Sequence, residues 1–361
     1  MKILHVFKTY FPYSNGGIER VIYDLVDRSQ KGDFKILGVS RDNKFSENFV
    51  NSIQVVYMPL LIEIASTPIF NCFDHRIREL FNWADIIHYH YPWPFGDIVH
   101  FMYGRKKRYV VTYHSDIVKQ RILNVLYSPL KYLFLKNASF VVTSSPQYAN
   151  SSRTLKRLNN VIVIPIGLDA SFGDNYRSIQ FEKPYFFFIG VHRYYKGLVY
   201  LVQAAVNLEC DVVIAGSGPE TNKLKALASE LGANNVKFPG QISEEEKVGY
   251  FKGCIAFVLP SHLRSEAFGV CLLEAMAAGK ALITTNIDSG MSYVNNDGVT
   301  GLSVSPCSVE SLRSAMLSLL QDRVLALRMG KAARERFVRK FTASVMRNSY
   351  DSLYRDILSS N

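Results

Sequence analysis

The sequence predicts an α/β protein built from two doubly wound halves. Short runs rich in β-branched and aromatic residues alternate with amphipathic stretches along most of the chain, which is typical of βα units around parallel sheets. The alternation stops near Leu168–Lys183, a polar segment that contains Gly, Asp and Asn and is typical of a linker. At 361 residues the chain is long for one domain and comfortable for two.

The first half is expected to consist of βα units. Its strands are predicted in the apolar runs Lys2–Phe7, Phe34–Ser40, Ile53–Met58, Asp85–Tyr89, Tyr109–Tyr113, Phe140–Ser144 and Val161–Pro165. Its helices are predicted in the amphipathic stretches Ile18–Arg28, Phe70–Asn82 and Pro146–Leu158.

The second half repeats the pattern. Its strands are predicted at Tyr185–Gly190, Val212–Ala215, Val236–Phe238, Ala256–Pro260, Ala281–Thr284 and Leu302–Val304. Its helices are predicted at Leu198–Asn207, Glu220–Leu231, Glu244–Phe251 and Val270–Ala278. From Ser308 onward the chain is expected to be mostly helical, ending in a helix at Ser344–Leu358.

These elements divide the chain into an N-terminal domain at 1–168, a linker at 169–183 and a C-terminal domain at 184–340. The last stretch, 341–361, is expected to form a helix that returns to the N-terminal domain. Two such domains imply a cleft between them, and ligands of doubly wound folds bind outside the carboxyl ends of the strands. We therefore expect the chemistry at these strand ends.

Composition narrows the cellular setting. The five cysteines are far apart and form no metal-binding spacing, which suits buried thiols in a reducing compartment. The N-terminus lacks the long apolar core of a signal peptide, and no window holds about 18 uncharged apolar residues, so a cytoplasmic protein is expected.

The segment Glu266–Gly279 (EAFGVCLLEAMAAG) carries the strongest chemical signal. Two carboxylates, Glu266 and Glu274, stand eight positions apart, the first just ahead of a predicted helix and the second inside it. The amides of Phe268–Val270 would lie at a helix N-terminus that is able to bind an anion. Glu266 could hold the hydroxyls of a sugar and Glu274 those of a ribose. The alternative is a capping Glu and a solvated Glu, although Glu274 has mostly apolar neighbours and would then need a partner.

These residues resemble the Glu-x-seven-Glu signature of the retaining glycosyltransferases called family 4. The blocks IAGSGPE (Ile214–Glu220), FPGQIS (Phe238–Ser243) and DGVTGLSVSP (Asp297–Pro306) resemble further blocks of that family in the same order. The resemblance implies the GT-B fold, in which two Rossmann-like domains face a cleft. It also implies that Glu274 holds the ribose, that Glu266 contacts the donor sugar, and that Gly216, Phe268, Gly269 and Val270 belong to the donor site.

The segment IGVHRYYKGL (Ile189–Leu198) places Arg193 and Lys196 on a loop after a predicted strand. Two cations there could neutralise a diphosphate leaving group, and the alternative is a pair of solvated loop cations. Family members often carry Arg directly after the Gly, where this chain has Val191. Arg193 is therefore expected to replace that Arg, whereas Lys196 matches the pattern.

In the N-terminal half, KTYFPYSNGGIER follows the first predicted strand. Gly16 and Gly17 permit a tight turn, and the helix after them offers amides to an anion. A Gly-Gly pair is often only a turn. The segment resembles the family's donor-phosphate and acceptor loop, which implies that Glu19 lies near the acceptor.

Histidines at two strand ends complete the predicted site. His114, in VTYHSD, ends a strand, and the family resemblance implies that it contacts the donor sugar, with Asp116 orienting sugar or acceptor. His88 and His90 alternate on the preceding strand; we interpret His88 as core and His90, with Tyr91 and Trp93, as a wall of the acceptor pocket. A metal is not expected, because no third ligand has suitable spacing and GT-B enzymes need none.

The basic segment 101–136 suggests contact with a membrane. It contains one acid, Asp116, and eight basic residues: Arg105, Lys106, Lys107, Arg108, Lys119, Arg121, Lys131 and Lys136. Within it, Ile117–Lys136 is dense in apolar and aromatic residues, as in a pair of surface helices lying on anionic lipid. The alternative is an internal helix with a basic edge.

The resemblance covers nearly the whole chain, and KTYFP-x3-GGIE and HYHYPWPF look most like the branch that makes bacterial surface polysaccharides such as lipopolysaccharide O-antigen. It implies a retaining transfer of mannose or a deoxyhexose such as rhamnose, from a GDP-sugar to a polyprenyl-diphosphate-linked saccharide at the cytoplasmic face of the inner membrane. No cofactor is expected. A UDP-N-acetylhexosamine transferase and a GT-B sugar-nucleotide epimerase are the alternatives. A dehydrogenase is disfavoured by the absence of GxGxxG, and nucleic-acid binding by the absence of a binding motif.

Overall fold

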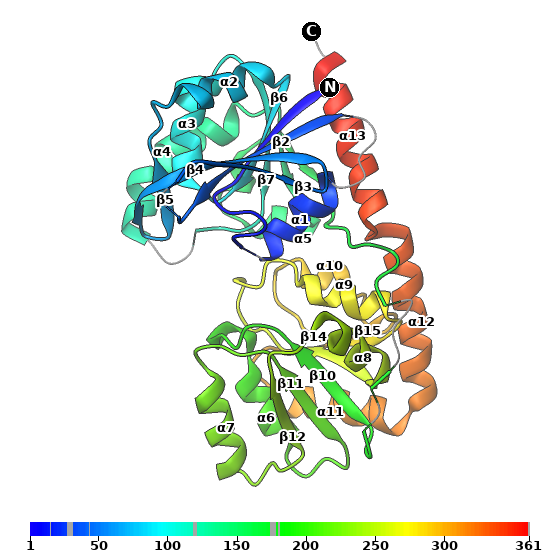
Figure 1. Ribbon diagram of the computed structural model, residues 1–361. Helices are drawn as coiled ribbons and strands as arrows, with labels where there is room; N and C mark the ends of the chain where they lie inside the picture. The colour runs from blue at the N-terminus through cyan, green and yellow to red at the C-terminus, as the bar shows by residue number, and fades with distance from the viewer. Residues whose placement is uncertain are drawn as a thin grey trace. The chain divides into compact units, whose positions relative to one another are not determined.

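The computed structural model describes residues 1–14, 16–26, 32–42, 44–117, 121–173, 178–179 and 181–359, without the side chains of residues 121, 122 and 124. The chain divides into two compact units (Figure 1). Unit 1 consists of Met1–Ile166 together with Ala343–Asn361, and unit 2 of Gly167–Thr342.

Unit 1 is built on a nine-stranded sheet in the order β3-β4-β2-β1-β6-β7-β8-β9, with β5 paired to β4. All neighbours are parallel except β3 and β5, which are antiparallel to β4. The strands are β1 (Lys2–Val6), β2 (Asp33–Ser40), β3 (Ser46–Val50), β4 (Ile53–Ile64), β5 (Thr67–Phe70), β6 (Ile86–Tyr91), β7 (Arg108–Tyr113), β8 (Phe140–Thr143) and β9 (Val161–Val163). The central strands β1, β6 and β7 are buried along nearly their whole length, as expected where helices cover both faces of a parallel sheet.

The helices of unit 1 are α1 (Gly17–Val26), α2 (His75–Trp83), α3 (Pro94–Val99), α4 (Arg121–Lys136), α5 (Pro146–Ser151) and α13 (Ala343–Ser359), with a π-helical turn at His100–Gly104 and a 3-10 turn at Leu155–Arg157. α13 packs beside α1, where Arg347 donates a hydrogen bond of 2.8 Å to the carbonyl of Asp24 (Figure 1). Tyr350 and Tyr354 of α13 enter the core of the unit. The last helix of the chain is therefore part of unit 1.

Three predicted elements of unit 1 were wrong in detail. The helix predicted at Phe70–Asn82 begins only at His75, where Asp74 caps it, because Phe70 ends the unpredicted strand β5. The helix predicted at Pro146–Leu158 stops at Ser151. In place of the helix pair predicted within Ile117–Lys136, residues 121–136 form one helix, α4, with Pro129 inside it; residues 118–120 lie outside the described part.

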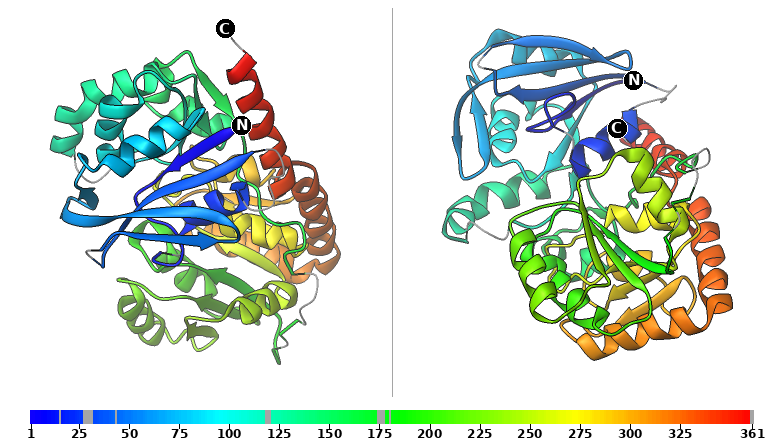
Figure 2. Two further views of the ribbon diagram at one scale, coloured as in Figure 1. Left: turned by 45° about the horizontal axis from the view of Figure 1, so that its top comes forward. Right: turned by 60° about the horizontal axis from the view of Figure 1, so that its bottom comes forward.

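Unit 2 is built on a six-stranded parallel sheet in the order β12-β11-β10-β13-β14-β15 (Figure 2). Its strands are β10 (Tyr185–Ile189), β11 (Asp211–Ala215), β12 (Val236–Gly240), β13 (Ala256–Leu259), β14 (Ala281–Thr285) and β15 (Gly301–Val304). Its helices are α6 (Leu198–Ala205), α7 (Thr221–Glu230), α8 (Glu244–Gly253), α9 (Val270–Ala277), α10 (Met291–Val294), α11 (Val309–Gln321) and α12 (Arg323–Lys340). A 3-10 turn at Tyr194–Lys196 precedes α6.

The two sheets share a feature that locates binding sites. In unit 2 the chain runs outward from β10 to β12 and then restarts at β13 on the other side of β10. In unit 1 it likewise restarts at β6 on the other side of β1. Because successive crossovers then leave on opposite faces of the sheet, each restart opens a crevice at the carboxyl ends of the two strands, and this is where doubly wound folds bind ligands.

Candidate active site

The restart point of unit 2 is occupied by an ion pair between two predicted site residues. Lys196 follows β10, Glu266 follows β13, and the Lys196 ammonium pairs with the Glu266 carboxylate. Each side chain is only 11% exposed. The hydroxyl of Ser261 also lies 3.3 Å from that carboxylate, in hydrogen-bonding position. The structure thus brings together a cation and a carboxylate that are 70 positions apart in sequence.

The loop that carries Lys196 is held close to β13. Gly197 has φ of +68°, and a Cβ atom there would lie 2.1 Å from the carbonyl oxygen of Pro260. Only glycine accepts this conformation and this approach without strain. The amide of His262 also donates to the carbonyl of Tyr195 at 3.0 Å. These contacts fix the direction in which Lys196 leaves the main chain.

The electrostatics of the pair favour the charged form of the lysine. Burial lowers the pKa of Lys196, but the attraction of Glu266 outweighs burial and leaves that pKa above its ordinary value. The thiol of Cys271 lies near this ion pair. Burial raises the pKa of this thiol to about 12, and Lys196, Glu266 and Glu274 all lie near enough to influence it. The Lys196–Glu266 pair and the Glu274 carboxylate therefore lie in the surroundings of one thiol, that of Cys271.

Helix α9 begins at this centre. Its N-cap, Gly269, has φ of +80° and side-chain atoms of Leu259 and Leu272 packed against it. The first amides of a helix have no acceptor within the helix, so the segment Phe268–Val270 presents N–H groups at a positive helix end. The structure thus gives this segment the geometry of an anion cradle.

Glu274 has a partner that sequence reasoning missed. Lys247, on α8, donates to the Glu274 carboxylate at 2.7 Å, and both side chains are largely buried. The attraction of Glu274 and Glu244 outweighs burial and raises the pKa of Lys247. The sequence had required a partner for Glu274 but offered no way to choose one, since 27 positions separate the two residues.

The remaining predicted donor residues lie around the same strand ends. Arg193 is exposed and directly precedes the 3-10 turn, whereas His192 is fully buried and bonded to Thr221 and to the carbonyl of Ala215. Val191, where family members often carry Arg, is 50% exposed. Gly216 follows β11, and its amide donates to the carbonyl of Gly240 at 2.7 Å.

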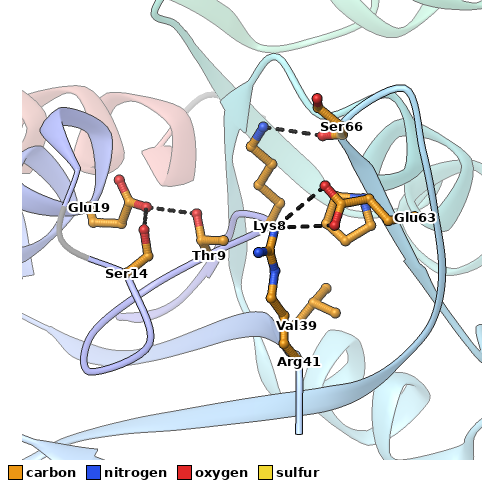
Figure 3. Close-up of a pocket in the computed structure, with 9 residues that line it drawn as sticks. Lys8, Thr9, Ser14, Glu19, Val39, Arg41, Glu63 and Ser66 are labelled. Atoms are coloured by element: carbon orange, nitrogen blue, oxygen red, sulfur yellow. Dashed lines mark hydrogen bonds and ion pairs between the residues drawn. The ribbon is translucent and has the colours of Figure 1, made fainter. Parts of the chain in front are cut away.

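Unit 1 contains a polar pocket of about 330 Å³ at the carboxyl ends of β1, β2 and β4 (Figure 3). Of the predicted residues it includes Glu19, whose carboxylate accepts from Thr9 at 2.7 Å and from Ser14 at 2.6 Å. The carboxylate also lies beside Gly16, and Gly17 begins α1. The full lining is Lys8, Thr9, Ser14, Glu19, Val39, Arg41, Glu63, Ser66 and Pro68.

Two cations of this pocket were not predicted. Arg41 pairs with Glu63 at 3.1 Å, and the Lys8 ammonium lies 3.4 Å from the carbonyl of Ser66 (Figure 3). Burial lowers the pKa of Lys8, and Arg41 adds to this, while Glu19 and Glu63 oppose it. Lys8 directly follows the first strand in KTYFP, a position that could have singled it out. Arg41 and Glu63 belong to no motif and are joined only by the fold.

His114 and Asp116 follow β7 in unit 1. His114 is half-buried, and its Nε2 lies 3.0 Å from Nδ1 of His90. The Asp116 carboxylate accepts from Tyr113 and Ser152 at 2.8 Å and from Tyr148 at 3.2 Å. These bonds tie the end of β7 to α5. A contact of Asp116 with sugar or acceptor stays a prediction.

The alternating histidines of β6 are both interior. His88 is fully buried between Tyr354 at 2.6 Å and Thr112 at 2.7 Å, as its assignment to the core required. His90, Tyr91 and Trp93 are at most 3% exposed. A role for them in the wall of an acceptor pocket stays a prediction.

The sequence offers no third metal ligand at a suitable spacing from His88 and His90, but the fold brings a third histidine beside them. His5, from β1, brings a ring nitrogen within 4.8 Å of those of His88 and His90. The planes of the His5 and His90 rings differ by only 22°, and their nitrogens meet edge to edge in a hydrogen bond of 3.0 Å. Both nitrogens of His88 are bonded elsewhere. Since imidazole lone pairs lie in the ring plane, this geometry is that of a hydrogen-bonded array rather than of three ligands converging on one ion.

Two Rossmann-like α/β units with parallel sheets are the architecture of the GT-B glycosyltransferases. Residues 175–336 match the model of "Glycosyl transferases group 1", and residues 15–172 match that of "Glycosyltransferase Family 4". The chain belongs to this family and is a glycosyltransferase, an enzyme that takes a nucleotide-sugar donor and a glycan acceptor.

Relatives and solved structures agree with this assignment. The chain is 39% identical to O-antigen chain mannosyltransferase C of Escherichia coli, over 100% of both chains. It is also 39% identical to the D-rhamnosyltransferase WbpZ of Pseudomonas aeruginosa, over 95% of this chain and 93% of that one. A glycosyltransferase from Rickettsia africae has the same fold, with a TM-score of 0.79 at 20% identity over 100% of this chain and 99% of that chain.

Proposed function

We propose that this enzyme transfers mannose or a deoxyhexose such as rhamnose, with retention of configuration, from a GDP-sugar to a lipid-linked saccharide in cell-surface polysaccharide synthesis. The observation that carries the proposal is the Lys196–Glu266 pair at the start of the Glu-x-seven-Glu helix. The mannosyl- and rhamnosyltransferase relatives at 39% identity support the choice of sugar.

The proposed mechanism assigns a task to each group of the centre. The diphosphate of the donor lies over the amides of Phe268–Val270, where Lys196 and Arg193 neutralise the charge that develops as the glycosidic bond breaks. Glu266 and His114 hold the sugar, and Glu274, oriented by Lys247, holds the ribose. The leaving phosphate accepts the acceptor's proton on the face from which it departs, so configuration is retained. No metal or other cofactor takes part in this scheme.

Nucleotide preference tests the donor assignment most directly. Melting temperatures are measured with GDP, UDP, ADP and dTDP at equal concentration, because at a given concentration a ligand stabilises the folded state more the smaller its Kd. GDP is expected to give the largest rise, and Glu274→Gln is expected to remove it. A rise with UDP alone would favour the N-acetylhexosamine alternative. GDP-mannose turnover to a free isomeric sugar nucleotide, with no glycoside, would instead indicate an epimerase.

We further propose that the pocket of unit 1 receives the acceptor. Its hydroxyl and carboxylate groups suit the hydroxyls of a saccharide, and Lys8 and Arg41 suit the phosphates of a polyprenyl diphosphate. Arg41→Ala is expected to raise the KM for a lipid-diphosphate acceptor about 10-fold while the affinity for donor nucleotide is unchanged. Lys44→Ala, which removes an exposed cation outside the pocket lining, is the matched control. An equal effect of both variants would contradict the assignment.

Contact with an anionic membrane is proposed through α4 and the basic residues before it. Leu123, Val125 and Leu126 of α4 are between 51% and 75% exposed, which is unusual for aliphatic side chains on a helix. Lys131, by contrast, is buried, so the basic residues of 101–136 do not all face solvent. Among the described residues, no helix is both long enough and apolar enough to cross a bilayer.

Vesicle flotation tests this contact. Replacing Arg105, Lys106 and Lys136 by Ser, or Leu123 and Leu126 by Ser, is expected to lower the bound fraction on vesicles that contain phosphatidylglycerol. Replacing Arg328, Lys331 and Arg339 by Ser in unit 2 changes the charge equally and serves as the control. Undiminished binding of both unit 1 variants would rule the contact out.

A further inference from the structure

We infer that His5 and His90 are positioning residues that fix the tautomer of His114, so that its Nδ1 carries the proton. The inference deepens the proposed function, since His114 is one of the residues proposed to hold the sugar. It rests on a row of imidazoles that runs from the core of unit 1 to the end of β7.

The row consists of three rings on three neighbouring parallel elements. Nδ1 of His5, on β1, lies 3.0 Å from Nε2 of His90, on β6. Nδ1 of His90 lies 3.0 Å from Nε2 of His114, just after β7. The planes of successive rings differ by only 22° and 19° and their centroids lie 5.3 Å apart, so the rings meet edge to edge in nearly one plane. The same pair of atoms, Nδ1 and Nε2, meets at both junctions, so the row has one repeating connection.

Each ring of the row carries a single proton at neutral pH. Burial lowers the pKa of His5 and of His114 to about 3, and that of His90 well below its ordinary value. A neutral imidazole has one donor and one acceptor nitrogen. All three rings must therefore share one orientation, with either every Nδ1 or every Nε2 protonated, because any other arrangement places two protons or two lone pairs at a junction.

The inner end of the row selects between the two orientations. Nε2 of His5 is fully buried and makes no hydrogen bond among the described residues. If every Nε2 were protonated, this atom would be a buried N–H without an acceptor, and orphaned buried N–H groups are rarer than under-used acceptors. If every Nδ1 is protonated, the atom is an unused lone pair instead. The second orientation is favoured, and it leaves Nδ1–H of His114 as the outer end.

This orientation defines what His114 offers a ligand. Its Nδ1–H donates a hydrogen bond, as to a sugar hydroxyl or a phosphate oxygen, and it cannot accept a proton there while the row is intact. His114 would thus hold the nucleotide-sugar by donating a hydrogen bond, rather than serve as a base. His88 takes no part in this row through hydrogen bonds, because its nitrogens bond to Tyr354 and Thr112.

The test is the tautomer itself, read by two-bond ¹H–¹⁵N correlation on the full chain labelled with ¹⁵N-histidine. His5, His90 and His114 are expected to show a protonated Nδ1 and a bare Nε2. His5→Asp places an acceptor where the Nδ1–H of His5 was, so Nε2 of His90 must donate, and His90 and His114 are expected to switch to the Nε2–H form. His5→Asn keeps an N–H near the position of Nδ1 and is expected to restore the wild-type pattern at His114.

The control is His100→Leu, which removes another buried histidine of unit 1, one that bonds to Tyr89 and lies outside the row. It should leave the His114 signals unchanged. An Nε2–H form of His114 in the wild type would overturn the inference even if His5→Asp does not fold. So would a stoichiometric Zn²⁺ held by His5, His88 and His90, because the metal would take the lone pairs that the row uses.

Kinetics supply a second readout. Loss of the Nδ1–H donor of His114 in His5→Asp is expected to lower kcat roughly 3- to 10-fold, with the acceptor KM unchanged and with recovery in His5→Asn. The spectra do not depend on which sugar is transferred. If the enzyme does not use a GDP-sugar, the tautomer result is unaffected. If His114 has the other tautomer, the assignment of the nucleotide-sugar donor is unaffected.

Discussion

Removing the charge of Glu266 is expected to cost both activity and stability. In Glu266→Gln the ammonium of Lys196 keeps its burial and loses its counter-charge; each side chain of the pair is only 11% exposed. Breaking a buried pair from one side costs about 3–5 kcal/mol, and the residual exposure favours the lower end, about 3 kcal/mol. For a unit of this size that corresponds to a fall in Tm of roughly 6–12 °C. Activity is expected to fall at least ~100-fold, as when one preorganised group at a reacting centre is lost.

The double variant Glu266→Gln/Lys196→Met separates the two effects. It removes both charges, so its free energy of unfolding is expected to return to within about 1 kcal/mol of the wild type, while transfer stays abolished. Calorimetry and chemical denaturation measure the stability, and donor turnover measures the activity. If Glu266→Gln is as stable as the wild type, Lys196 does not need Glu266 as a counter-charge, and the stability argument is refuted. If the double variant regains transfer, the pair has no catalytic task.

Three further predictions concern the same unit. Lys247→Met is expected to raise the Kd of GDP several-fold, and Glu274→Ala more than 10-fold, in titration calorimetry; unchanged affinity would contradict a ribose contact. Gly197→Ala is expected to lower the free energy of unfolding by at least about 2 kcal/mol in chemical denaturation, from positive φ plus the approach to Pro260, and wild-type stability would refute this. The pKa of Lys196 lies above its unfolded value, so the stabilisation that comes from the lysine's charge is fully present at neutral pH and is lost only above about pH 10. If the wild type, but not Lys196→Met, lost stability between about pH 7 and 9, the pKa of Lys196 would not be raised.

The sequence was informative where a structural feature depends only on residues within one short segment. The apolar runs of β1, β6 and β7 predicted parallel strands, and the fold class is confirmed by the relatives and by solved structures. The predicted boundaries were wrong where contacts between distant segments, rather than the local sequence, determine the structure. The turn at Ala65–Ser66 has positive φ in two residues other than glycine, so the β4–β5 hairpin carried no turn signal. Strand β3 is an edge strand whose side chains alternate between partly and fully exposed, but its sequence, SENFV, does not alternate between apolar and polar residues.

The site divides along the same line. Both glutamates of the Glu-x-seven-Glu segment lie within nine consecutive residues, so their placement around one helix start could be predicted from spacing alone. Their partners could not. Lys247 is 27 positions from Glu274, and His5 is 85 positions from His90. Such pairs are set by strand order and register, which a single sequence does not specify.

Strand order also explains why the polar groups of both units gather where they do. In unit 2, the loops after β10 and β13 supply Lys196 and Glu266. In unit 1, Lys8 follows β1, the central strand at which the order restarts. Crossovers leave on opposite faces at these points, so the strand ends stay open and charged side chains there keep access to a ligand. Elsewhere along the sheets, helices cover the strand faces and the same side chains would be buried without partners. The two charged centres therefore follow from topology, and the segments after β1, β10 and β13 are where changes of substrate specificity are to be expected.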